Sequence, residues 1–130
     1  MKRNIAMWIV LLAALFVASS AAFAHHGTGL YYGTGTVTMK GTITEFAFVN
    51  PHSQIYFDVK NEKGETEHWA AECVSPGKLA RAGFSRDTLK PGDQVTITLH
   101  PGKSGETVGS FVKIILPDGK ELPLRNGGGE

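Results

Sequence analysis

The stretch SPGKLARAG, residues 75–83, decides the fold, because it places one short helix inside a sequence that otherwise alternates like β-strands. Ser75 is a typical N-cap residue, and Pro76 suits the first helical position. Gly83 ends the helix after about two turns, since glycine adopts the left-handed conformation that closes many helices. We therefore predict a helix over residues 77–82, with strands before and after it.

Three strands are predicted before this helix, over residues 36–48, 54–60 and 66–73, because apolar and polar residues alternate within each. Residues 61–64 form a tight turn between the second and third strands. A three-residue loop places Phe57 opposite Trp69 and Asp58 opposite His68. A four-residue loop would turn Trp69 to the solvent, so the hydrophobic pattern selects the first register. Gly41, in the middle of the first strand, predicts a bulge or a barrel corner.

Two strands are predicted after the helix, over residues 94–100 and about 110–116, and residues 121–124 add a short extra strand. Three strands, a helix and two strands is the order of the OB-fold, so we predict an all-β fold: a small, five-stranded OB-like barrel. A β-sandwich is the alternative, which the helix between strands three and four disfavours. The residues expected to share the core are Val37, Ile43, Ile55, Phe57, Trp69, Ala71, Val95, Ile97, Leu99 and Ile114.

The N-terminal region has the pattern of a signal peptide. Lys2 and Arg3 precede an apolar run over residues 5–18, and Ala22-Phe23-Ala24 resembles a signal peptidase site. The run is shorter than the ~20 apolar residues of a membrane span. No cysteine lies near the predicted cut, so we do not expect a lipid anchor. We expect residues 1–24 to be removed, which leaves a periplasmic or secreted chain without a membrane span. Its parts are a flexible Gly-rich arm (25–35), the barrel domain (36–125) and a disordered tail (126–130).

Composition excludes several classes of function. Without Lys2 and Arg3 the chain has 11 basic and 12 acidic side chains and no basic cluster, which disfavours nucleic-acid binding. Cys73 is the only cysteine, so no internal disulfide can form. We interpret Cys73 as a buried small hydrophobic residue, with a reactive thiol or an intermolecular bridge as the alternatives.

Several motifs occur together in one known pattern: the His-His pair at 25–26, GTITEF (41–46), NPHS (50–53), Trp69, Ser75-Pro76 with Leu79 and RAGF (81–84), LKPGD (89–93), His100-Pro101 and PDG (117–119). In these motifs the sequence resembles one family of small exported bacterial proteins that is catalogued only as a domain of unknown function. The resemblance covers nearly the whole mature chain, although Phe48 and Phe84 stand where tryptophan is expected. It implies a signal peptide and a single β-rich domain, and it supplies no activity.

Histidines are the candidate metal ligands, because imidazole commonly binds copper, zinc and nickel. Cleavage after Ala24 would give His25 a free amine, so amine and ring could chelate one copper ion together. Cleavage one residue earlier would make His26 the third residue, which also binds Cu(II) or Ni(II). The OB topology places the loops that carry His52 and His100 beside one binding face. We thus name His25, His26, His52 and His100 as metal candidates, with copper as the candidate cofactor. The competing interpretation is that His52 shapes its loop and His100 is an exposed strand end.

The face of strands two and three is the other candidate site, since OB barrels bind ligands there. Its candidate ligand-binding residues are Asn50, His52, Tyr56, Asp58 and His68. Asp58 and His68 also fit a simple cross-strand pair. Our first hypothesis is a periplasmic binding or accessory module for a small ligand or an envelope protein, with copper binding as its most specific form. The alternative is an interaction subunit of an envelope complex without metal. A copper-dependent enzyme is third, because no nucleophile elbow, paired carboxylates or Cys-x-x-Cys motif is present.

Overall fold

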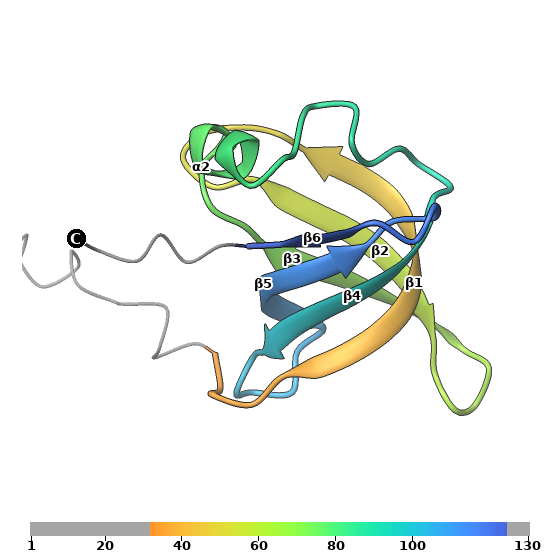
Figure 1. The fold of residues 1–130 in the computed structure, drawn as a ribbon. Coiled ribbons are helices and arrows are strands. Elements are labelled where there is room, and N and C mark those ends of the chain that lie inside the picture. The colour runs from red at the N-terminus through yellow and green to blue at the C-terminus, as the bar shows by residue number, and fades with distance from the viewer. Residues whose placement is uncertain (1–31, 125–130) are drawn as a thin grey trace, which may run out of the picture.

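The computed structural model describes residues 32–124, which form a β-barrel with one short helix. Strands β1, β2, β3, β5 and β4 follow one another around the barrel, and β1 closes it by pairing with β4 (Figure 1). The β3–β5 pair is parallel and all the other pairs are antiparallel. The OB-like barrel predicted from the sequence is therefore confirmed. In chain order the elements are β1 (Val37–Ala47), β2 (Gln54–Lys60), β3 (Thr66–Glu72), α2 (Pro76–Arg81), β4 (Gln94–Pro101), β5 (Val108–Ile115) and β6 (Glu121–Pro123).

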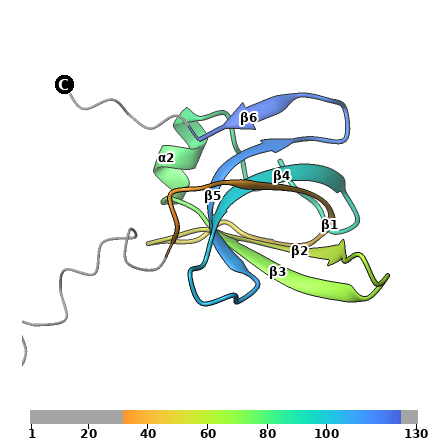
Figure 2. The same ribbon diagram turned by 90° about the horizontal axis from the view of Figure 1, so that it is seen from below.

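Strand β6 is the predicted extra strand, and it lies against β5 (Figure 2), on the same edge of β5 as β3 but further along the strand. It pairs with β5 from Lys113 to Ile115 and buries Leu122. Within residues 32–124, no helix is long and apolar enough to cross a membrane.

The β2–β3 hairpin has the predicted register. Phe57 pairs with Trp69, and Asp58 pairs with His68. The Asn61 side chain accepts hydrogen bonds from the backbone amides of Lys63 and Glu65, which fixes the turn. Gly64 has a φ of 77°, the left-handed conformation that this turn requires. Turn chemistry and hydrophobic alternation therefore agree on one register.

Helix α2 lies at the end of the barrel where β1 ends (Figure 1). Ser75 occupies the N-cap position without a side-chain capping bond, and Pro76 begins the helix, as predicted. Gly83 follows the helix with a φ of 96°, and the amide of Phe84 donates to the Leu79 carbonyl at 3.0 Å. Leu79 is fully buried, so the helix contributes one side chain to the core of the barrel.

Eight of the ten predicted core residues are buried, and two predictions need correction. Val37 is 37% exposed, because it begins β1 at the barrel end opposite α2. Trp69 is half-buried: it stacks on Phe57 with ring centroids 6.4 Å apart, but one edge stays accessible. The β3–β5 pairing covers only Ala70 to Glu72 and leaves the edge of β3 open beside Trp69. Buried residues that the prediction omitted are Leu79, Phe84, Leu89, Phe111 and Leu122, most of them outside the five main strands.

Two glycines allow close approach of strands inside the barrel. A Cβ at Gly41 would lie 2.8 Å from the Phe57 ring and 3.0 Å from the Asp58 carbonyl oxygen. A Cβ at Gly109 would overlap the Leu99 side chain and lie 2.8 Å from the His100 carbonyl oxygen. Gly41 therefore serves close packing, whereas the register shift of β1 falls between Ile43 and Glu45.

Candidate functional site

The outer face of β2 and β3 carries a shallow hollow. Its walls include Tyr56, Asp58 and His68, three of the five residues predicted to bind a ligand. Tyr56 is 38% exposed, one of the few large hydrophobic side chains that the described part of the chain leaves open. Thr107, in the loop between β4 and β5, lines the same hollow. The loop is held there by the amide of Ala70, which donates to the Thr107 carbonyl at 3.1 Å.

Asp58 and His68 form the polar centre of this hollow. His68 Nδ1 lies 2.6 Å from Asp58 Oδ1, and the histidine side chain is 83% exposed against 32% for the aspartate. The cross-strand pair expected from the sequence is therefore present. Such an exposed pair contributes at most about 1 kcal/mol to stability. The pair holds the carboxylate in place through Oδ1 and leaves Oδ2 without a hydrogen bond to the described protein.

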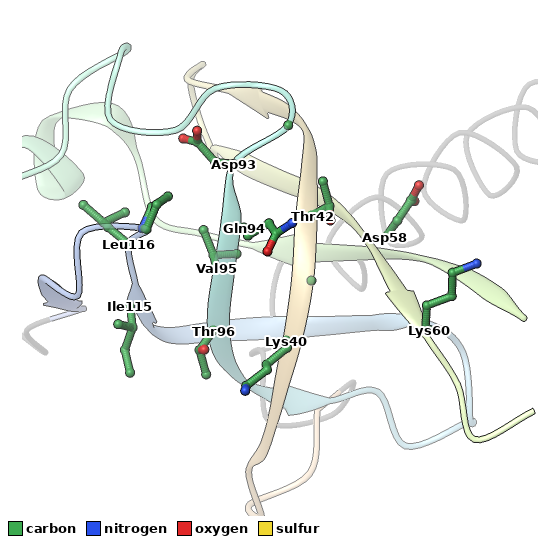
Figure 3. A pocket seen from close by; sticks show the side chains of 13 residues that line it. Lys40, Thr42, Asp58, Lys60, Asp93, Gln94, Val95, Thr96, Ile115 and Leu116 are labelled. Atoms are coloured by element: carbon green, nitrogen blue, oxygen red, sulfur yellow. The ribbon is translucent and has the colours of Figure 1, made fainter. Parts of the chain in front are cut away.

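A second and larger hollow begins at Asp58 and crosses β1 toward β4. Thr42, Lys40, Gln94 and Thr96 lie along it, and Figure 3 shows Thr42 beside Gln94 where β1 crosses β4. Lys60 and Asp93 stand at its edges. The two hollows share Asp58, so they form one surface, which we call the outer trough. Nothing in the sequence predicted that these side chains line a hollow.

The β1–β2 loop and the N-terminal segment meet at Glu72, the last residue of β3. His52 Nδ1 lies 3.4 Å from Glu72 Oε1, and the Tyr32 hydroxyl donates to Glu72 Oε2 at 3.0 Å. Partial burial and the bond to Glu72 raise the pKa of Tyr32 to about 12. One carboxylate thus joins two segments that are far apart in the chain. We call this arrangement the rim cluster.

Residues 32–35, the described part of the predicted arm, lie along the end of β4. Tyr32 forms a bridge with Gly102, and the amide of Gly33 donates to the Pro101 carbonyl at 3.1 Å. His100 Nδ1 lies 2.8 Å from the Gly35 carbonyl oxygen. On the outer face, Ser110 of β5 pairs with Glu72 on one side and with His100 on the other. Glu72 and His100 therefore flank Ser110 on the outer face, whereas His52 lies in the β1–β2 loop, at the end of the barrel where β1 ends.

The contacts of His52 and His100 define which ring nitrogen is available. His52 Nδ1 lies 3.2 Å from the Cys73 carbonyl oxygen, and His100 Nδ1 faces the Gly35 carbonyl. A carbonyl oxygen only accepts hydrogen bonds, so Nδ1 is the donor in each contact, and in a neutral ring the lone pair is then on Nε2. Metal-binding histidines are commonly oriented in this way by a backbone carbonyl. Each ring therefore has a nitrogen that can bind a metal.

Within residues 32–124, however, no three His, Cys, Asp or Glu side chains are grouped to hold a metal ion. Glu72 and His100 are separated by β5, which places their backbones about 10 Å apart at the usual strand spacing. The predicted metal candidates His25 and His26 lie outside the described residues. The predicted shared site of His25, His52 and His100 thus remains a prediction.

Cys73 is buried, as the sequence suggested, with its Sγ 3.7 Å from the Ala71 carbonyl oxygen. Burial, together with the nearby Glu72 charge, raises the pKa of the thiol far above its usual range. A thiol that stays protonated is a poor nucleophile and a poor metal ligand. Cys73 is therefore assigned to packing.

Sequence reasoning placed some site residues better than others. Asn50 is exposed in the β1–β2 loop, and His52 lies in the rim cluster, so neither lines the hollow with Tyr56. Tyr32 and Glu72 were not among the predicted site residues. Their signal was weak: Glu72 alternates outward on β3, and Tyr32 is an aromatic residue in a Gly-rich segment. Nothing in the sequence indicated that the two would meet.

Comparison with known proteins gives a family and no activity. A family model matches residues 13–111, and its description is a family of unknown function, DUF6152. No curated protein and no solved structure matches the chain.

Proposed function

The chain belongs to DUF6152, a family of unknown function, and from its own residues we propose that it is an exported binding module. Its ligand lies on the outer face of β2 and β3. The observation that carries this proposal is the hollow in which Tyr56, Asp58 and His68 come together next to the β4–β5 loop. OB-like barrels bind ligands on this face, between these loops. Export rests on the signal-peptide pattern of residues 1–24.

Ligand binding by the module is tested by NMR titration of the 15N-labelled protein that begins at His25. Three defined probes are titrated separately: Cu(II), a neutral oligosaccharide and a neutral hexapeptide. We expect at least one probe to shift the backbone signals of Tyr56, Asp58 and His68 in a saturable way, while the signal of Lys78, which is exposed on α2, stays unchanged. If none of the probes shifts signals on this face, the binding module is rejected in favour of an interaction subunit whose contacts lie elsewhere.

We further propose copper as a ligand of His52 and His100. The supporting observation is that His52 and His100 both direct Nδ1 to a backbone carbonyl and so leave Nε2 for a metal. The mature N-terminus adds an amine and the His25 ring. His25 lies seven positions before Tyr32, and such a segment spans at most about 25 Å, enough to reach the rim cluster. Copper binding in the cell would make this an accessory protein for metal handling in the envelope.

A Cu(II) titration separates the contributions to that site. We expect the His25→Ala variant to weaken binding, and the His52→Ala/His100→Ala double variant to weaken it beyond the loss seen with His25→Ala alone. His68→Ala is the matched control, because His68 is an exposed histidine of the outer trough. If the double variant binds as tightly as the parent, only the N-terminal chelate remains. If His68→Ala weakens binding as much as the double variant, the assignment of copper to His52 and His100 is wrong.

A further inference from the structure

The outer trough is continuous across four strands. Gln94 of β4 pairs with Thr42 of β1, Thr42 pairs with Asp58 of β2, and Asp58 pairs with His68 of β3. Paired residues point to the same side of a sheet, so these four side chains form one row on the outside of the barrel. At the usual strand spacing the row is about 14 Å long. A surface of this length suits an oligomer better than a single small molecule.

The chemistry of the trough favours a neutral, polyhydroxylated ligand. Lys40 and Lys60 are balanced by Asp58 and Asp93, and Glu45 adds one negative charge, so the lining has a formal net charge of only −1. Carboxylates inside the trough would repel a polyanion such as a nucleic acid. Hydroxyls, an amide, carboxylates and ammonium groups together supply both donors and acceptors, which matches the hydroxyl groups of a sugar.

The polar side chains in the middle of the trough are free to bind. Within residues 32–124, no hydrogen bond or ion pair joins the side chains of Lys40, Thr42, Gln94 or Thr96 to other protein atoms. Asp58 uses only Oδ1 toward His68, and Asp93 uses only Oδ2 toward the Lys90 amide, so each has an oxygen left. A ligand in the trough can therefore form hydrogen bonds without breaking bonds of the fold.

Tyr56 supplies an apolar surface at the β3 end of the trough. It pairs laterally with Glu45 on β1 and with Ala70 on β3, so small and flexible side chains leave its ring accessible. An aromatic face with a polar edge suits the C–H face of a sugar ring, whose hydroxyls can reach the neighbouring carboxylates.

From these observations we infer that the outer trough binds a neutral oligosaccharide, several sugar units long, with one unit stacked on Tyr56 and others extending across β1 to Gln94. This inference rests on the proposed binding module and names the class of its ligand. It does not involve the rim cluster or copper.

The fold supplies an intrinsic probe for the test. Of the two tryptophans, Trp8 lies in the predicted signal peptide, so Trp69 is the only one in the mature chain, and it lines the hollow beside Tyr56. Trp69 fluorescence is followed during titration with β1–4-linked oligomers of glucose and of N-acetylglucosamine, each as monomer, dimer, tetramer and hexamer. We expect a saturable change with at least one series and an affinity that rises about tenfold or more from the monomer to the tetramer.

Variants divide the trough into its two ends. Tyr56→Ala should weaken binding of every oligomer by about tenfold, whereas Tyr56→Phe keeps the ring and should stay close to the parent. Gln94→Ala should weaken the hexamer and leave the dimer unchanged, because only the longer ligand reaches β4. Val49→Ala and Lys78→Ala are controls at exposed positions outside the trough, and they should change nothing.

Three results would overturn the inference. The first is that neither oligomer series changes the fluorescence or the backbone signals of the trough. The second is that affinity does not depend on oligomer length. The third is that the neutral hexapeptide binds the trough and the sugars do not, in which case the binding module stands and the sugar assignment fails.

Discussion

Gly109→Ala tests whether the barrel closes as tightly as the structure indicates. Gly109 is buried in β5, between Pro101 of β4 and Ala71 of β3, at the point where the parallel strand pair completes the barrel. An added Cβ would overlap the Leu99 side chain and lie 2.8 Å from the His100 carbonyl oxygen. Leu99 is fully buried and the carbonyl belongs to the backbone, so neither can easily move away.

Overpacking of this kind usually costs about 1–3 kcal/mol, and we expect a loss near 3 kcal/mol because a backbone atom is involved. For a domain of this size the melting temperature should then fall by roughly 10–20 °C. Gly77→Ala is the matched control. Gly77 lies in α2, and an added methyl group there would meet no other atom within 4 Å, so alanine should stabilise the protein by about 0.5–1 kcal/mol.

The assay is urea unfolding of the chain from His25 to Glu130, followed by Trp69 fluorescence and far-UV circular dichroism. A Leu99→Val change in the Gly109→Ala background should recover part of the loss, since it shortens the side chain that the new Cβ meets. If Gly109→Ala unfolds at the same urea concentration as the parent, the close approach of β5 to β4 is wrong, and with it the detailed geometry of barrel closure.

Four further predictions concern other parts of the molecule. Trp69→Ala should cost about 2–3 kcal/mol in urea unfolding, less than a fully buried tryptophan, because its ring is half-buried; a loss below about 0.5 kcal/mol would contradict its packing on Phe57. The Tyr32 hydroxyl should titrate near pH 12 by ultraviolet absorbance, because its pKa is raised in the folded protein. The stability that it contributes should be present below pH 10 and should decline as the pH rises toward 12. Tyr32→Phe should remove that decline, and an unchanged pH profile of stability in this variant would refute the bond to Glu72. Cys73 should not react with a thiol reagent in the folded protein and should react fully in urea, so rapid labelling of the native state would show that the thiol is accessible. N-terminal sequencing of exported protein should read His-His-Gly, and retention of residues 1–24 would remove the basis of the N-terminal copper chelate.

Local signals in the sequence were sufficient for the elements and for the β2–β3 register. Alternation fixes which side of a strand faces the core, and a turn of defined length then allows one pairing of Phe57 with Trp69. Ser75-Pro76 and Gly83 bound the helix through backbone preferences that act within a few residues. From these parts the barrel followed, because an isolated helix between the third and fourth strands suits few other β-architectures.

Local signals also placed Tyr56, Asp58 and His68 on one face, because they alternate outward on two strands of known register. The prediction failed at Val37 and Trp69 for the same physical reason. Alternation reports which way a side chain points, but burial depends on what covers it, and the barrel leaves its end at Val37 and the edge of β3 at Trp69 open.

Only the tertiary structure joined segments that are distant in the chain. Tyr32 meets Glu72 across 40 residues, and Thr42 meets Gln94 because β1 pairs with β4 to close the barrel. Neither contact has a sequence pattern, since a polar side chain on an outward position looks the same whether it faces solvent, a hollow or a partner. The sequence by itself therefore determined the elements, their order and the direction of each side chain. Closure and coiling of the sheet decided which of those side chains form the outer trough and the rim cluster.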